Sequence, residues 1–463
     1  MNDAAGDSRV YLLADGPEAL RVRLALIDGA RSRLAMQYYL WHGDDAGAMV
    51  AARTLAAADR GVSVRILLDD IDTAGLDGFL LTFQAHPHIE LKVFNPIKRG
   101  WLRPWEILTR FTELNRRMHN KAMVADGDRC VVGGRNIGSP YFGLDPRMAF
   151  NDLDILGTGA VAAQTEACFD AYWACPRSVT VTDIGAVEPD AGPGTLRTML
   201  ELVAARGAER LAVVSRGDPV GMDSWRDLLS PADAEVIADP PDKSWRRGKR
   251  KMNLASRLGR TLQQARHEVL IVSPYFVPRR GVIDKLARLC DRGVDLRVLT
   301  NSQASNDVVA VHAGYAPKRR ALLERGVELF ELQPDGGQLR KSGKAKIRFR
   351  PSTSLASLHA KVFVIDRTRC FIGSFNLDPR SVRLNTEMGV MVDSPAIAAE
   401  AAEFALALMD SAYKVTLVAD ADGRKRLRWT SSGGRTYDHD PHAGIGARLL
   451  VRLLGLLPIE AQL

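Results

Sequence analysis

The sequence lacks the features that mark a secreted or membrane-spanning protein. Its 463 residues include five cysteines, an odd number at scattered positions without a CxxC pair, so we expect neither a disulfide framework nor a cysteine-rich zinc site. The start, MNDAAGDSRVYLLADG, has no basic stretch followed by an apolar one, which argues against a signal peptide. No apolar run reaches the roughly 18 residues of a membrane span. These absences favour a protein of the reducing cytosol.

Positive charge is in excess, and the chain carries a net charge of +8. Such a balance favours anionic partners, whether nucleic acid, anionic lipid or phosphorylated substrates. Two clusters concentrate the charge, KSWRRGKRK (243–251) and RKSGKAKIRFR (340–350). Each is interpreted either as a solvated basic loop or as a surface for phosphate head groups. For the second interpretation, the candidate lipid-binding residues are Arg246, Arg247, Lys249 and Arg250.

The longest apolar stretch is GIGARLLVRLLGLLPIEAQL, residues 444–463, which Arg448 and Arg452 interrupt. Pro458 should end any helix there. A helix with one basic side could lie on a membrane surface or pack as a terminal core helix. Of the two, we favour core packing, because most apolar helices are buried.

One polar pattern occurs twice, as MHNKAMVADGDRCVVGGRN (118–136) and LHAKVFVIDRTRCFIGSFN (358–376). Each copy contains His-x-Lys-x₄-Asp, then Arg-Cys, then Gly-x-x-Asn. The repeat extends further, because RGVSVRILLDD (60–70) matches RGVDLRVLTNS (292–302) in the same order and at a similar offset. A period this long indicates a duplicated domain rather than a solenoid.

Both copies alternate apolar strands with helices, which predicts an α/β fold with two mixed or largely parallel sheets flanked by helices. A pseudo-twofold arrangement would bring both motifs to one interface. We divide the chain into a first domain (1–180), a turn-rich and basic junction that includes a helix (181–255), a second domain (256–440) and an apolar C-terminal segment (441–463).

The paired motifs offer the groups needed to displace an alcohol from a phosphodiester. Two imidazoles, His119 and His359, supply a nucleophile and a general acid near neutral pH. Lysine and asparagine side chains supply donors for the non-bridging phosphate oxygens. They are Lys121, Asn136, Lys361 and Asn376.

Two later carboxylates could orient the imidazoles through their second nitrogens. Asp152 follows His119 and Glu387 follows His359, so we expect each acid to orient the histidine of its own motif. A metal site is disfavoured, because each histidine is accompanied by a lysine, which repels a cation. We therefore expect no metal and no other cofactor. Gly134 stands where the second copy has Ser374, so the two halves should not be chemically equivalent.

These motifs resemble the phospholipase D superfamily, whose HxKxxxxD signature occurs twice in its two-domain members, and the resemblance covers nearly the whole chain. It implies two similar α/β halves with the active site between them. It also implies that His119 is the nucleophile and His359 the acid. The motif aspartates Asp126 and Asp366 would be structural.

Within the superfamily, SPYFVP (273–278), HAGYAPKRRALLERGVELFEL (312–332) and GSFNLDPRSVRLNTEMGV (373–390) look like bacterial cardiolipin synthases. The segment ADPPDK (238–243) and the ending LPIEAQL are similar to the soluble C-type subgroup. The resemblance implies that a phosphatidyl group moves from phosphatidylglycerol or phosphatidylethanolamine to phosphatidylglycerol. The protein would act as a peripheral enzyme on the inner face of the cytoplasmic membrane.

Three other functions stay open at this point. Attack by one histidine on phosphorus would give a phosphohistidine. If this intermediate passed its phosphatidyl group to water, the protein would be a phospholipase D that releases phosphatidic acid. The basic charge would suit a nuclease or other phosphodiesterase, although the small nucleases of the superfamily carry one motif, and we expect no nucleic-acid partner. The third alternative is a non-catalytic protein that binds anionic lipid, and the presence of both histidines and both lysines argues against it.

Overall fold

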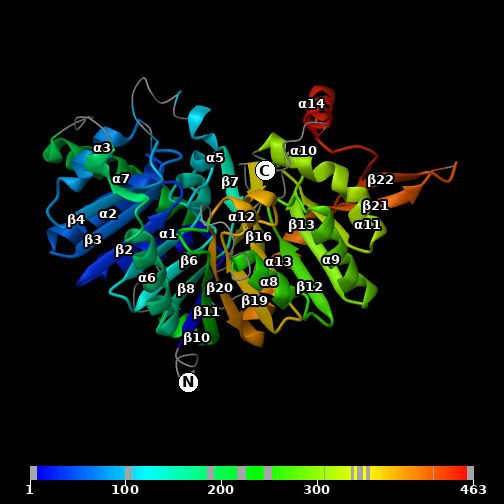
Figure 1. The fold of residues 1–463 in the computed structure, drawn as a ribbon, viewed down its shortest axis with the longest axis horizontal. Helices are drawn as coiled ribbons and strands as arrows, with labels where there is room; N and C mark the ends of the chain where they lie inside the picture. The colour runs from blue at the N-terminus through cyan, green and yellow to red at the C-terminus, as the bar shows by residue number, and fades with distance from the viewer. Residues whose placement is uncertain are drawn as a thin grey trace.

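The computed structural model shows two α/β halves side by side (Figure 1). It describes residues 8–73, 75–97, 99, 105, 108–184, 192–215, 226–243, 253–306, 308–334, 338–340, 348–350, 355–420 and 422–455.

The first half is built on a nine-stranded sheet with the order β10-β1-β8-β6-β5-β2-β3-β4-β9. Strands β2, β3 and β4 are parallel to one another, and β5 runs antiparallel to β2. In chain order the strands are β1 (Arg9–Leu13), β2 (Arg33–Tyr38), β3 (Ser63–Asp69), β4 (Ile89–Phe94), β5 (Ala122–Ala125), β6 (Arg129–Gly133), β8 (Asp154–Thr158), β9 (Ser178–Thr180) and β10 (Ser230–Pro231).

The second half is built on a ten-stranded sheet with the order β11-β20-β19-β18-β12-β13-β14-β21-β22-β23. Its strands are β11 (Asp233–Ala238), β12 (Glu268–Val272), β13 (Asp295–Asn301), β14 (Glu328–Leu332), β18 (Val362–Ile365), β19 (Arg369–Gly373), β20 (Met388–Asp393), β21 (Ala412–Ala419), β22 (Lys425–Thr430) and β23 (Thr436–Tyr437). The run β20-β19-β18-β12-β13-β14 repeats the run β8-β6-β5-β2-β3-β4 of the first sheet. The expected α/β fold with two duplicated mixed sheets is therefore confirmed.

Helices cover the faces of both sheets (Figure 1). In the first half they are α1 (Gly16–Asp28), α2 (Asp45–Asp59), α3 (Asp77–Gln84), α5 (Phe111–Leu114), α6 (Ala160–Trp173) and α7 (Pro193–Ser215). In the second half they are α8 (Leu254–Leu262), α9 (Arg280–Asp291), α10 (Val309–Tyr315), α11 (Arg319–Glu324), α12 (Pro379–Arg383), α13 (Pro395–Asp410) and α14 (Ile445–Gly455).

One continuous apolar core joins the two halves. It includes Phe169 of α6 and Phe404 of α13, together with residues of β6 and β8 from one sheet and of β19 and β20 from the other. A small parallel ladder also crosses between the halves, formed by β7 (Met148–Asn151) and β17 (Leu355–Leu358). Because β17 immediately precedes His359, this ladder fixes the second motif against the first half.

The segment we assigned as a junction belongs to both sheets. Strand β10 pairs with β1 of the first sheet, and β11 pairs with β20 of the second. The helix α7 expected there packs on α2. The division of the chain into four ranges stays a prediction.

The C-terminal helix α14 does not pack as a core helix, so our favoured interpretation of that segment is wrong. Its apolar side chains Ile445, Leu449, Leu450 and Leu453 are about half exposed or more, and Val451 is buried. The helix packs against α10 and lies at one edge of the molecule (Figure 1). Helix α10 is its main neighbour in the described part of the chain, and one helix can cover only part of its surface.

The described part of the chain contains neither a membrane-spanning helix nor the proposed lipid-binding arginines and lysine. Among the described residues no helix is long and apolar enough to cross a membrane. The proposed lipid-binding residues Arg246, Arg247, Lys249 and Arg250 lie outside the described part of the chain. Lys243, the first residue of that cluster, has a side chain that is only 6% exposed and donates to Asp239 Oδ2 over 2.7 Å, so its ammonium group is not part of a surface for lipids.

Candidate active site

Each motif histidine lies just before a central strand and is hydrogen-bonded to the backbone of the other half. His119 precedes β5, and its N–H donates to the carbonyl of Thr386 over 2.9 Å. His359 precedes β18, and its N–H donates to the carbonyl of Asn151 over 2.9 Å. These bonds place both motifs at the interface between the halves.

The two supporting carboxylates are crossed between the halves. His119 Nδ1 lies 2.8 Å from Glu387 Oε2, and His359 Nδ1 lies 2.6 Å from Asp152 Oδ2. We expected each acid to serve the histidine of its own motif, and that pairing is wrong. Asp152 and Glu387 are fully buried where the two sheets meet, so each faces the opposite motif.

Burial and positive neighbours keep both imidazoles neutral in the ligand-free protein. Burial, followed by the charges of Lys121 and Lys361, lowers the pKa of His119 well below its ordinary value. The pKa of His359 falls to about 4, chiefly through burial and then Lys361. Because Nδ1 of each ring faces a carboxylate, Nε2 is the nitrogen left for chemistry.

The two carboxylates differ in the direction in which their pKa values are shifted. Burial raises the pKa of Glu387 to about 7 despite the nearby Lys121. Burial also acts to raise the pKa of Asp152, but the adjacent His359 and Lys361 outweigh it and lower that pKa. At neutral pH Asp152 is therefore charged, while Glu387 is close to its midpoint.

The motif lysines are buried beside their own histidines. Lys121 Nζ donates to the carbonyl of His119 over 2.7 Å, and Lys361 Nζ donates to the carbonyl of His359. Lys121 also lies 5.1 Å from the centre of the Tyr39 ring. Burial lowers the pKa of Lys121 well below its ordinary value, so an anion between the lysines would be strongly stabilised.

The asparagines and the serine also lie in this region. Asn136 Nδ2 donates to the hydroxyl of Tyr141 over 2.9 Å, and the Tyr141 ring packs 5.0 Å from His359. Asn376 Oδ1 is buried without a partner among the described residues. Ser374 Oγ donates to Glu387 Oε2 over 2.5 Å.

Gly134, which takes the place of Ser374 in the first half, has no room for a side chain. A Cβ there would come within 2.2 Å of Asp152 Oδ1. The shorter aspartate thus approaches the backbone directly, whereas the longer Glu387 is held by a hydroxyl. The two His–carboxylate pairs are therefore built differently, as the sequence difference suggested.

Asp126 and Asp366 lie at the far ends of β5 and β18 from the histidines. Asp126 accepts the N–H groups of residues 31, 32 and 33, and Asp366 accepts those of residues 266, 267 and 268. Both aspartates have left-handed backbone angles, with φ of 54° and 52°. Their contacts tie each β5–β6 or β18–β19 turn to the start of β2 or β12.

Sequence reasoning missed a second pair of repeat positions. Asp69 Oδ2 accepts the N–H of Met118 over 2.8 Å, and Asn301 Oδ1 accepts the N–H of Leu358 over 2.9 Å. Each therefore holds the residue just before a motif histidine. The sequence carried a signal for this pair, because Asp69 and Asn301 occupy the same position in the matched segments LLDD (67–70) and LTNS (299–302). The packing of Tyr39 on His119, with ring centres 4.8 Å apart, had no such signal.

No group of three or more histidine, cysteine or acidic side chains is placed to hold a metal ion in the described ranges. The arrangement instead offers two oriented imidazoles and two buried ammonium groups around one interface. Such a set can bind a phosphodiester, attack it and protonate its leaving group.

Comparison with known proteins gives consistent matches. A family profile described as "Cardiolipin synthase, PLD-like domain" matches residues 24–173 and again residues 258–408. The chain is 37% identical to cardiolipin synthase C of Escherichia coli (strain K12) over 98% of this chain and 96% of that protein. It is 26% identical to cardiolipin synthase A of Pseudomonas entomophila (strain L48), over 89% of this chain and 70% of that protein.

The fold also matches a solved structure. The crystal structure of phosphatidylserine synthase from Haemophilus influenzae Rd KW20 superimposes with a TM-score of 0.65, covering 98% of this chain and 95% of that one. The two sequences are 14% identical, so this likeness concerns the fold alone.

Proposed function

Since this chain belongs to the cardiolipin synthase family of phospholipase D-like enzymes, we propose that its interface site transfers a phosphatidyl group to phosphatidylglycerol through a phosphohistidine. The observation that carries the proposal is the crossed pair of His–carboxylate contacts at one interface. Two oriented imidazoles beside two buried lysines suit a double displacement at phosphorus.

In the first step, Nε2 of His119 attacks phosphorus, a P–N bond forms, and the bond to the leaving alcohol breaks. His359, protonated once the anionic substrate is bound, gives its proton to the departing oxygen. In the second step the acceptor hydroxyl gives its proton to His359 and attacks phosphorus, and the P–N bond breaks. Lys121, Lys361, Asn136 and Asn376 would hold the non-bridging oxygens, whose charge persists throughout.

The donor in this proposal is phosphatidylglycerol or phosphatidylethanolamine, and the protein works as a peripheral enzyme on the cytoplasmic membrane. The test is to incubate the protein with phosphatidylglycerol liposomes, with and without phosphatidylethanolamine, and to extract the lipids. Cardiolipin supports the transferase. Phosphatidic acid without cardiolipin would point to a hydrolase, and no turnover would point to a lipid-binding protein.

Activity should persist without any divalent metal, because the buried lysines are proposed to hold the phosphate. We expect cardiolipin formation in excess chelator to stay within a few-fold of the rate with added metal. Mild stimulation by a divalent ion would be compatible with this, since such ions change the packing of anionic lipids. Complete loss that a single ion restores would contradict the proposed mechanism.

Binding to phosphatidylglycerol liposomes should weaken as salt rises, because basic residues contribute about 1 kcal/mol each near an anionic surface and salt screens them. Reversing the charge of Arg246, Arg247, Lys249 and Arg250 should weaken cosedimentation further. Turnover of a short-chain soluble substrate should not change, which controls for folding.

A second variant separates charge from apolar insertion. Leu449→Gln with Leu453→Gln alters exposed side chains of α14 and should weaken binding even at high salt. If neither salt nor charge reversal affects binding while the α14 variant abolishes it, insertion of α14 alone is the better account. If none of the three has an effect, docking requires another partner.

A further inference from the structure

Arg117, two residues before the first motif histidine, is a buried cation with unused donors. Its side chain is 1% exposed, and Nη1 donates to the carbonyl of Asn95 over 3.1 Å. The same nitrogen lies 3.4 Å from Asp69 Oδ1. Nε and Nη2 are buried and have no hydrogen-bond partner among the described residues. Leaving charged donors unpaired in the interior is costly, so these two nitrogens are suited to receive an anionic group.

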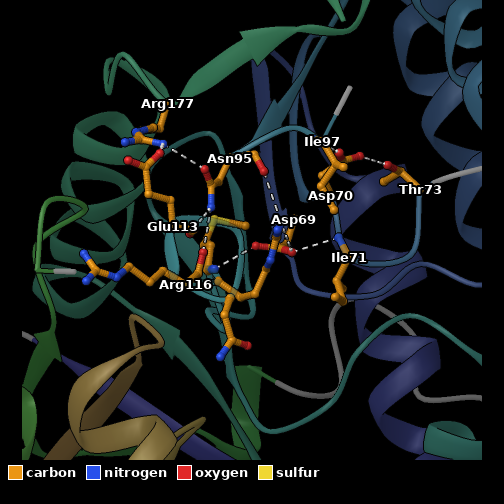
Figure 2. Close-up of polar contacts among 12 residues, drawn as sticks. Asp69, Asp70, Ile71, Thr73, Asn95, Ile97, Glu113, Arg116 and Arg177 are labelled. Carbon is orange, nitrogen blue, oxygen red and sulfur yellow. Dashed lines mark hydrogen bonds and ion pairs between the residues drawn. The ribbon is translucent and has the colours of Figure 1, made fainter. Parts of the chain in front are cut away.

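The surrounding hydrogen bonds hold Arg117 in place but do not occupy all the donors of its guanidinium. Figure 2 shows Asp69 accepting from the backbone of Ile71, while Asn95 is tied to Glu113, Arg116 and Arg177. Asp69 also accepts the N–H of Met118. Its carboxylate is thus shared among several donors, with only one long contact to the guanidinium.

Arg117 and His119 lie on the same side of an extended segment. The carbonyl of Arg117 and the N–H of His119 both bond Thr386, in the pattern of a parallel ladder. Alternation along such a segment puts residues two apart on one side. Arg380 of the other half is also close, because its charge is among those that lower the pKa of His119, and Asn115 holds its guanidinium through two bonds of 2.6 and 2.9 Å.

We propose that Arg117 binds the phosphate of the acceptor lipid, a second phosphodiester site beside the reacting one. The inference rests on the proposed function, because only an acceptor such as phosphatidylglycerol brings a phosphate that does not react. Two residues of extended chain span about 7 Å, which is within reach of the three-carbon glycerol that joins the two phosphates of the product. A guanidinium suits this task, since its fork of donors matches phosphate oxygens.

The position that corresponds to Arg117 in the second motif is not a cation. At the same distance before His359 stands Ser357, whose hydroxyl is buried and also lacks a partner among the described residues. An uncharged hydroxyl cannot replace a guanidinium as a partner for phosphate. The asymmetry assigns the acceptor phosphate to Arg117 of the first half, while the acceptor hydroxyl still meets His359.

A partition experiment tests the acceptor site. Vesicles of phosphatidylglycerol with added 1-butanol offer the same phosphohistidine two acceptors, one with a phosphate and one without. Arg117→Gln should lower the ratio of cardiolipin to phosphatidylbutanol by about tenfold to a hundredfold, the usual effect of losing a hydrogen bond to a charged group. Arg117→Lys, which keeps the charge but loses the fork, should lie between. Ser357→Ala, the matched control, should keep the wild-type ratio.

The ratio does not depend on how much enzyme is folded, because both products arise from one intermediate. An unchanged ratio in Arg117→Gln would overturn the acceptor site. If that variant is inactive, the acceptor site can be tested on the wild type with soluble acceptors. The wild type should use glycerol phosphate as an acceptor at far lower concentrations than glycerol. Equal use of the two would overturn the inference. A wild type that makes phosphatidylbutanol but no cardiolipin would instead refute the proposed synthase function.

Discussion

Replacing either motif histidine with alanine should lower cardiolipin synthesis by roughly 10³-fold or more, because each imidazole performs a step that nothing else in the site can perform. The double variant His119→Ala/His359→Ala should be no worse than either single variant, as expected for residues that act as a unit. Product extraction from phosphatidylglycerol vesicles measures the effect. His439→Ala, at an exposed histidine, is the control and should be fully active.

An activated donor separates the two roles. A phosphatidyl ester of p-nitrophenol has a leaving group that needs no general acid. His359→Ala should therefore still release a burst of p-nitrophenol and retain the phosphatidyl group on the chain, whereas His119→Ala should show no burst. The reverse result would exchange the two assignments. Near-normal cardiolipin synthesis by His359→Ala would refute the two-histidine mechanism.

The second large effect should come from the crossed carboxylates. Asp152→Asn and Glu387→Gln keep side-chain size but remove the negative charge that orients each imidazole, and each should lower turnover by roughly 10²- to 10⁴-fold. Because Asp152 contacts His359 and Glu387 contacts His119, Asp152→Asn should behave like His359→Ala with the activated donor. Glu387→Gln should behave like His119→Ala. Pairing within each motif would produce the opposite assignment.

The pH dependence gives an independent check on Glu387. Its pKa is raised to about 7, so the carboxylate is lost as pH falls below about 7. A protonated Glu387 would donate to Nδ1 of His119 and force the proton of the ring onto Nε2, which then cannot attack phosphorus. Wild-type activity should therefore fall on the acid side of neutrality. Glu387→Gln should lack that dependence, and an identical acid limb in the variant would assign it to another group.

Much of the fold followed from local pattern. The duplicated His-x-Lys-x₄-Asp blocks and the matched strands at 60–70 and 292–302 were enough to predict two similar α/β halves. Alternating strands and helices have distinct periodicities, and a repeat constrains both copies at once. The same motifs identified the histidines, lysines and asparagines as candidate site residues, and the structure brings them together at one interface. Their catalytic roles stay a prediction that the variants above test.

Tertiary structure alone decided how these residues are partnered. Asp152 and Glu387 were identified as candidate supports, but their crossing between the halves depends on contacts more than 200 residues apart in the chain. The unpaired donors of Arg117 likewise depend on which neighbours surround it. The exposure of α14 depends on how few elements pack against it. Sequence periodicity reports which side of an element is apolar, whereas the partner that covers that side, or satisfies a buried charge, is set by long-range packing of the whole chain.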